Sequence, residues 1–80
     1  MNYGLAKDLA ETIAGLHRKM NEVYNVTGWE IYETFPEADT LYYLFLRMVD
    51  GIADDNSREA FESYTNGLLT FDELLAEVCE

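Results

Sequence analysis

The first third of the chain has a helical spacing of apolar residues, and this pattern constrains the fold more than any other feature. Six apolar side chains recur at steps of four, four, three, four and three residues: Leu5, Leu9, Ile13, Leu16, Met20 and Val23. Because a helix has about 3.6 residues per turn, this spacing puts all six on one face. The sequence therefore predicts an amphipathic helix from about Tyr3 to Tyr24, whose apolar face other elements must cover.

The next segment is short and aromatic. Residues 25–28 read as a turn, and the stretch from Thr27 to Glu30 has the Thr-x-x-Glu spacing of a capping box. We expect a short helix over about residues 28–34. A strand through Trp29, Ile31 and Phe35 is the alternative.

A third helix is predicted to begin at about Pro36 or Thr40 and to end at Asp50. The stretch Thr34-Phe35-Pro36-Glu37 repeats the capping spacing, and proline is tolerated in a first helical turn. One face of this helix carries Leu41, Leu44, Phe45, Met48, Val49 and Ile52, while Tyr42, Tyr43 and Leu46 extend the apolar surface to its other sides. A helix that is apolar all round is buried, so we expect this one to be the most enclosed.

Two more helices are indicated in the last third. Asn56 to Glu59 has the spacing of a helix start, and Asn66-Gly67 supplies residues that accept a left-handed conformation at a helix end. Thr70 to Glu73 starts a fifth helix, and Leu69 is placed to pack on Leu74. The core-facing residues of this last helix are expected to be Phe71, Leu74, Leu75 and Val78.

These elements predict an all-α fold, a compact single-core bundle of four to five short helices. Eighty residues suffice for one small domain, which we assign to residues 1–80. The composition, 49% hydrophobic and 14% aromatic, favours a folded chain in spite of a formal charge of −11.

The sequence favours a cytoplasmic location, which is the host cytoplasm if a phage encodes the protein. Its first residues lack the basic start and apolar stretch of a secretion signal, and the apolar run Leu41–Leu46 is too short to cross a bilayer. The lone Cys79 cannot form an internal disulfide and fits a reducing compartment.

Catalytic and metal-binding patterns are not found. The acidic stretch that begins at Asp50 does not fit a calcium loop in the registers starting at Asp50 or Asp54. One histidine and one cysteine cannot close a zinc site, and we expect His17 to face solvent or to be half-buried. Phosphate-binding loops and the G-x-S-x-G motif are missing too. We therefore predict a non-enzyme without a metal or cofactor.

The acidic residues are placed unevenly. Residues 1–29 hold three acids and three bases, whereas residues 30–80 hold thirteen acids against Arg47 and Arg58. Capping explains some of these acids, but Asp50 and Glu77 fall at helix ends, where the helix dipole disfavours negative charge. Two rows at helical spacing, Asp55/Glu59/Glu62 and Glu73/Glu77/Glu80, also set like charges side by side, which costs roughly 0.2–0.5 kcal/mol per pair.

An uncompensated charge that costs stability suggests selection for the charge itself. Adaptation to high salt would spread acids over the whole chain, so we prefer complementarity to a basic partner. The same charge argues against direct binding to nucleic acid or to an acidic membrane. The predicted partner-binding residues are Glu30, Glu33, Asp50, Asp54, Asp55, Glu59, Glu62, Glu73 and Glu77, with Trp29 and Tyr32 as aromatic anchors.

In kind, such a chain looks like the small acidic inhibitors that phages and mobile elements direct against nucleases, CRISPR complexes and polymerases. Immunity proteins against nuclease toxins are similar in kind. The likeness implies an inhibitor that mimics the charge of DNA and occupies a basic, nucleic-acid-binding surface. We expect the protein to be a monomer or a homodimer.

Two other functions stay open. One is a helical adaptor or anti-activator that binds through an apolar helix face, with its acids serving solubility. The other is a carrier-like domain, because Ala38-Asp39-Thr40-Leu41 is similar to the Asp-Ser-Leu attachment motif of acyl carrier proteins, which are also short, acidic and helical. Thr40 stands where that family has its phosphopantetheine-bearing serine.

Overall fold

The computed structural model describes residues 2–27 and 29–79, with the side chain of Trp29 outside the described part. Over these residues the chain forms five α-helices and no strand: α1 (Tyr3–Tyr24), α2 (Trp29–Thr34), α3 (Pro36–Val49), α4 (Asp55–Thr65) and α5 (Phe71–Val78). The predicted all-α bundle is confirmed. The strand alternative for the aromatic segment is wrong, because residues 29–34 are helical.

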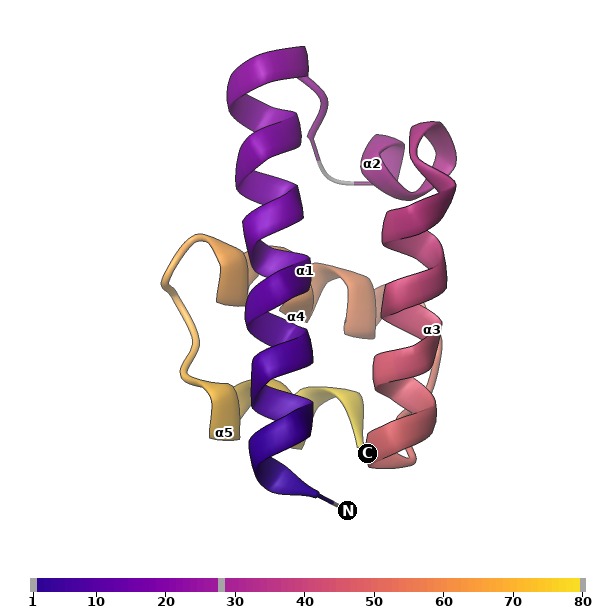
Figure 1. Ribbon diagram of the computed structural model, residues 1–80. Helices are drawn as coiled ribbons and strands as arrows, with labels where there is room; N and C mark the ends of the chain where they lie inside the picture. Colours follow the sequence, from indigo (N-terminus) through magenta and orange to yellow (C-terminus); the bar gives the residue numbers. More distant parts are fainter. Residues whose placement is uncertain (1, 28, 80) are drawn as a thin grey trace.

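Two pairs of helices form two layers (Figure 1). Helices α1 and α3 run side by side in opposite directions and pack on one another, and α4 and α5 form a hairpin that crosses behind them. Helix α2 packs on α3 at the end of the bundle away from α5. None of the helices in the described ranges combines the length and apolar composition needed to span a bilayer.

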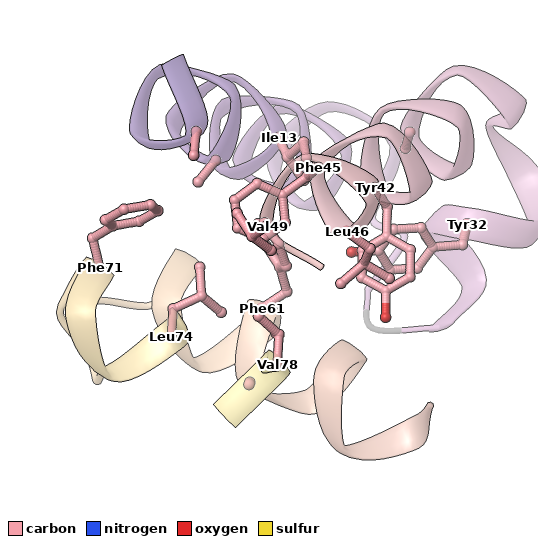
Figure 2. Close-up of a cluster of buried hydrophobic side chains, with 14 of the residues drawn as sticks. Ile13, Tyr32, Tyr42, Phe45, Leu46, Val49, Phe61, Phe71, Leu74 and Val78 are labelled. Atoms are coloured by element: carbon pink, nitrogen blue, oxygen red, sulfur yellow. The ribbon is translucent and has the colours of Figure 1, made fainter. Parts of the chain in front are cut away.

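The core fills the space between the two layers. Figure 2 shows Phe61, Leu74 and Val78 of the hairpin lying opposite Phe45 and Val49 of α3. The Phe61 ring meets the Phe45 ring edge to face at 5.1 Å between centroids, a geometry that aromatic pairs favour. As predicted, Phe71, Leu74 and Val78 bury the inner face of α5.

The buried face of α1 matches the predicted one only in part. Ile13 and Met20 are buried and Leu9 and Leu16 pack against the core, as predicted. The buried residues of α1 are Ala6, Ala10, Ile13, Ala14, His17 and Met20, so the face is turned toward the alanines. Leu5 and Val23, which the apolar pattern placed inside, are 57% and 63% exposed. Short alanine side chains let the neighbouring helices approach α1 closely, and close packing of this kind decides which face is buried.

Helix α3 is not enclosed on all sides, contrary to the sequence prediction. Its buried residues are Ala38, Tyr42, Phe45, Leu46 and Val49. Leu44 is 46% exposed, and Ile52 beyond the helix is 49% exposed. The reason is that α3 stands at the edge of its layer, with α1 beside it and the hairpin behind it, and none of the described helices covers its outer side (Figure 1).

Two helix starts also differ from the predicted capping boxes. Thr34 is the last residue of α2, so α3 is capped at Phe35 without a side-chain hydrogen bond, and Pro36 occupies the first turn as expected. Helix α4 begins after Asp54 rather than at Asn56, because Asp54 has the extended backbone that a cap requires. The predicted box at Thr70 and Glu73 is confirmed. The box at Thr27 involves Gly28, which lies outside the described residues.

Candidate functional site

The predicted acidic row of α4 lies on the side of the helix opposite the core. Asp55 and Glu59 are exposed and Glu62 is half-buried. The residues that α4 buries are Ser57, Ala60, Phe61 and Thr65. Burying Phe61 therefore turns the three carboxylates outward, since residues three or four apart share a helix face.

Helix α5 brings two more carboxylates to the same hairpin. Glu73 and Glu77 are exposed, and Glu77 lines a shallow groove of about 210 Å³ together with Asn56, Glu59, Ala60, Ser63 and Leu69. Asn56 links the two helices across this groove, because its Nδ2 donates a hydrogen bond to Glu77 Oε2 at 3.2 Å. We call the five residues Asp55, Glu59, Glu62, Glu73 and Glu77 the acidic hairpin face. Glu80, which the second row included, lies outside the described residues.

Some predicted site residues have structural roles that account for them. The Asp54 carboxylate accepts a hydrogen bond from the Ser57 backbone N–H at 2.9 Å and so caps α4. The Glu73 carboxylate accepts from the Thr70 backbone N–H at 2.9 Å in the capping box of α5. The capping role accounts for a carboxylate at each of these positions, so a partner protein is not needed to explain them. Glu73 is nevertheless exposed on the acidic hairpin face.

Asp50 is explained by the turn after α3. Its φ of 58° lies in the left-handed region, where aspartate is tolerated better than most residues. The Gly51 N–H donates to the Leu46 carbonyl at 2.8 Å, the closing bond of a Schellman motif. The adjacent Ile52 N–H donates to the Val78 carbonyl at 2.8 Å, which ties this turn to the end of α5. The helix dipole disfavours an acid at Asp50, but the left-handed backbone of the turn accounts for it.

The two acids of α2 lie on a different helix from the acidic hairpin face. Glu30 and Glu33 are exposed, but α2 lies at the end of the bundle away from α5 (Figure 1). Trp29, the first predicted anchor, has its side chain outside the described residues. The nine predicted acids therefore fall into three groups: the acidic hairpin face, the two acids of α2, and Asp50 and Asp54 at the two ends of the turn between α3 and α4.

Tyr32 and His17 are buried together, against both predictions for them. Tyr32 is 7% exposed and His17 2% exposed, and the Tyr32 hydroxyl lies 2.8 Å from His17 Nε2. Tyr32 is therefore part of the core and not an anchor on the surface. Burial lowers the pKa of His17 to about 4, which keeps the imidazole neutral at pH 7. The flanking Arg18 and Lys19 had suggested an exposed histidine, but the steps from Ala10 to Ile13 and on to His17 place its side chain on the buried face.

Arg58 contacts a group of tyrosines on the inner side of α4. Its guanidinium carbon lies 5.9 Å and 5.8 Å from the ring centroids of Tyr32 and Tyr42, within the range of cation–π attraction. Its Nη2 also lies 3.4 Å from the Tyr43 hydroxyl. Burial raises the pKa of Tyr42 to about 12, so this phenol stays protonated at neutral pH. Arg58 is the single base among residues 50–80, which hold nine acids.

The outer side of α3 is a second surface, although its apolar pattern predicted burial. Tyr43 and Leu44 are 44% and 46% exposed there. Together with Asp39, Thr40 and Arg47 they line a hollow of about 430 Å³. The sequence did contain a sign that this side is exposed. Asp39 and Arg47 lie four positions before and after Tyr43, and a buried helix face would not carry both charges.

Neither metal ligation nor a known relative identifies a function. Within residues 2–27 and 29–79, the structure does not bring three or more His, Cys, Asp or Glu side chains together as metal ligands. The Thr40 hydroxyl of the carrier-like stretch donates to the Pro36 carbonyl at 3.0 Å. Comparison with family models, with curated proteins and with solved structures finds no match.

Proposed function

We propose that this protein is a non-enzymatic inhibitor or regulator that binds a basic, nucleic-acid-binding surface of another protein through its acidic hairpin face. The observation that carries the proposal is the placement of five carboxylates on two packed helices, of which Glu59 of α4 and Glu77 of α5 line one shared groove. A rigid hairpin holds these charges in a fixed arrangement, as a nucleic acid holds its phosphates.

The charge of the hairpin supports this function in two ways. A concentration of one sign of charge speeds the encounter with an oppositely charged surface, and it disfavours partners that are themselves acidic. A basic surface that ordinarily holds a phosphate backbone matches this requirement. The protein would then act by occupying the surface, in the manner of the small acidic inhibitors of nucleases and CRISPR complexes that the chain resembles in kind.

We place this activity in the cytoplasm. Cys79 is a free and exposed thiol, which a reducing compartment would keep reduced. Proteins that handle nucleic acids, the proposed partners, work in the same compartment.

The test begins with affinity capture from a bacterial lysate at low ionic strength, followed by measurement of the dissociation constant of each captured nucleic-acid-binding protein. The expected result is a constant that rises steeply as salt increases from about 0.05 to 0.3 M, because screening weakens attraction between exposed charges. An affinity that does not change over this range would contradict the proposal.

A pair of matched variants locates the charge that matters. We expect Glu59→Lys with Glu77→Lys to weaken binding at least about tenfold, which corresponds to about 1.4 kcal/mol. Glu30→Lys with Glu33→Lys makes the same change in net charge on α2, outside the acidic hairpin face, and should have a much smaller effect. Equal effects of the two variants would mean that only the total charge matters.

The exposed apolar residues of α3 favour the second candidate, an adaptor that binds through a helix face. In that case the charge of the hairpin would serve solubility alone. Reversal of Glu59 and Glu77 would leave partner binding intact, and Leu44→Ala would abolish it. The two functions are therefore separated by the same binding assay.

A further inference from the structure

The outer side of α3 exposes apolar surface in the middle of the helix. Tyr43 is 44% exposed and Leu44 is 46% exposed, next to one another. The hollow of about 430 Å³ that they line adjoins a second one of about 390 Å³, since Thr40 lines both. Exposed apolar surface that is gathered in this way marks a contact with another molecule more often than scattered side chains do.

The charges on this side of α3 indicate which kind of molecule can bind there. Asp39, Tyr43 and Arg47 are spaced four residues apart and all line the larger hollow. The row is thus negative at its N-terminal end, aromatic in the middle and positive at its C-terminal end. A uniformly basic partner would meet repulsion at Arg47, and a uniformly acidic one would meet repulsion at Asp39.

A surface with the same two charges in reverse order fits the row without repulsion. A second copy of α3, turned end for end, has this order, because Asp39 and Arg47 are each four residues from Tyr43. We infer that two copies of the protein associate through their α3 helices, antiparallel about a two-fold axis near Tyr43. Asp39 of each copy then lies beside Arg47 of the other, and the Tyr43 and Leu44 side chains pack between the two pairs. Such an interface uses the same patch on both subunits, as two-fold dimers do.

The inference is independent of the proposed function, because the α3 surface and the acidic hairpin face share no residue. The net charge of the protein gives the Asp39–Arg47 pairs a role in such a dimer. Each copy carries a formal charge of −11, so two copies repel one another at a distance. The paired Asp39 and Arg47 side chains offset this repulsion locally and fix the orientation in which Tyr43 and Leu44 meet.

The first measurement is sedimentation equilibrium of the full chain at about 0.15 M salt, from low micromolar to about 1 mM protein. We expect a reversible monomer–dimer equilibrium. Leu44→Glu should raise the dimer dissociation constant at least about tenfold by placing a charge in the interface. Leu68→Glu is the matched control, because Leu68 is 73% exposed in the connection between α4 and α5, and it should leave the constant unchanged. Circular dichroism verifies that both variants keep their helices.

A charge swap tests the orientation. Asp39→Arg and Arg47→Asp each set like charges together at both contacts, so each should weaken the dimer at least about tenfold. The double variant restores opposite charges and keeps the net charge at −11, so it should recover the wild-type dissociation constant. A double variant as weak as the single ones would overturn the antiparallel arrangement. A wild-type chain that stays monomeric at every concentration, or a dimer that tolerates Leu44→Glu, would overturn the inference as a whole, and the α3 surface would then belong to another protein or to none.

Discussion

His17 of α1 and Tyr32 of α2 meet inside the core, with 2.8 Å between the imidazole Nε2 and the phenol oxygen. Their rings also touch edge to face, at 5.2 Å between centroids. This contact joins α2 to the long first helix. Since both polar atoms are buried, each depends on the other for its hydrogen bond.

The first prediction concerns the stability of the fold against acid. His17 has an unfolded pKa near its ordinary 6.5 and a folded pKa of about 4, so the unfolded chain binds the proton more readily. Its contribution is fully present above about pH 6.5 and is lost progressively as the pH falls toward 4. Between pH 7 and pH 5 the loss is about 2 kcal/mol. Urea unfolding of the wild type and of His17→Leu at both pH values measures it.

His17→Leu serves as its own control for the other titrating groups. The carboxylates titrate in both proteins, so the difference between the two pH dependences belongs to His17. If the wild type and the variant lose the same stability between pH 7 and pH 5, the imidazole is not held neutral by burial.

The second prediction compares the effect on stability of replacing two glycines, Gly51 and Gly15, by alanine. At Gly51 an added Cβ would lie 2.8 Å from Leu46 Cδ2 and 3.1 Å from the Val78 carbonyl oxygen, so Gly51→Ala should lower the free energy of unfolding by about 1–3 kcal/mol. At Gly15, inside α1, an added Cβ meets nothing within 4 Å. Gly15→Ala should raise the stability by about 0.5–1 kcal/mol. Denaturant unfolding of both variants measures the contrast, and a loss at Gly15 equal to that at Gly51 would be evidence against the close approach at the α3–α4 turn.

The third prediction separates capping from partner binding at Asp54. Asp54→Ala removes the acceptor for the Ser57 N–H and should destabilise the protein by about 1 kcal/mol. Asp54→Asn keeps a capping oxygen while it removes the charge, so most of the stability should remain. Thermal unfolding distinguishes the two variants. If both lose stability equally, the charge and not the cap supports α4 at this position.

The sequence was a good guide where a local pattern matched a local requirement. Thr70 and Glu73 predicted the start of α5 because a capping box involves residues three positions apart and little else. Gly67, with a φ of 78°, ends α4 as expected, because the left-handed conformation favours glycine wherever the helix packs. The cap of α4 was not predicted at Asp54, because several polar residues at the start of this helix could serve as its N-cap. Which of them does so depends on the path of the chain after Asp50.

The candidate functional surfaces could be predicted from the sequence to a smaller extent. Asp55, Glu59, Glu73 and Glu77 are exposed because the opposite sides of α4 and α5 bury Phe61, Leu74 and Val78. That these two helices lie beside one another, with Glu59 and Glu77 on one groove, depends on how the hairpin packs. The separation of Glu30 and Glu33 from this face likewise follows from the place of α2 in the bundle.

By itself the sequence determined the helical class, the positions of the helices and the excess of negative charge in the last two thirds of the chain. These properties depend on residue type and on spacing within one helix. Only the tertiary structure decided that α1 buries its alanines, that His17 and Tyr32 share a hydrogen bond in the core, and that Tyr43 and Leu44 face outward. Periodicity gives each helix an apolar side, but the side that is finally buried is the one against which the neighbouring helices pack most closely.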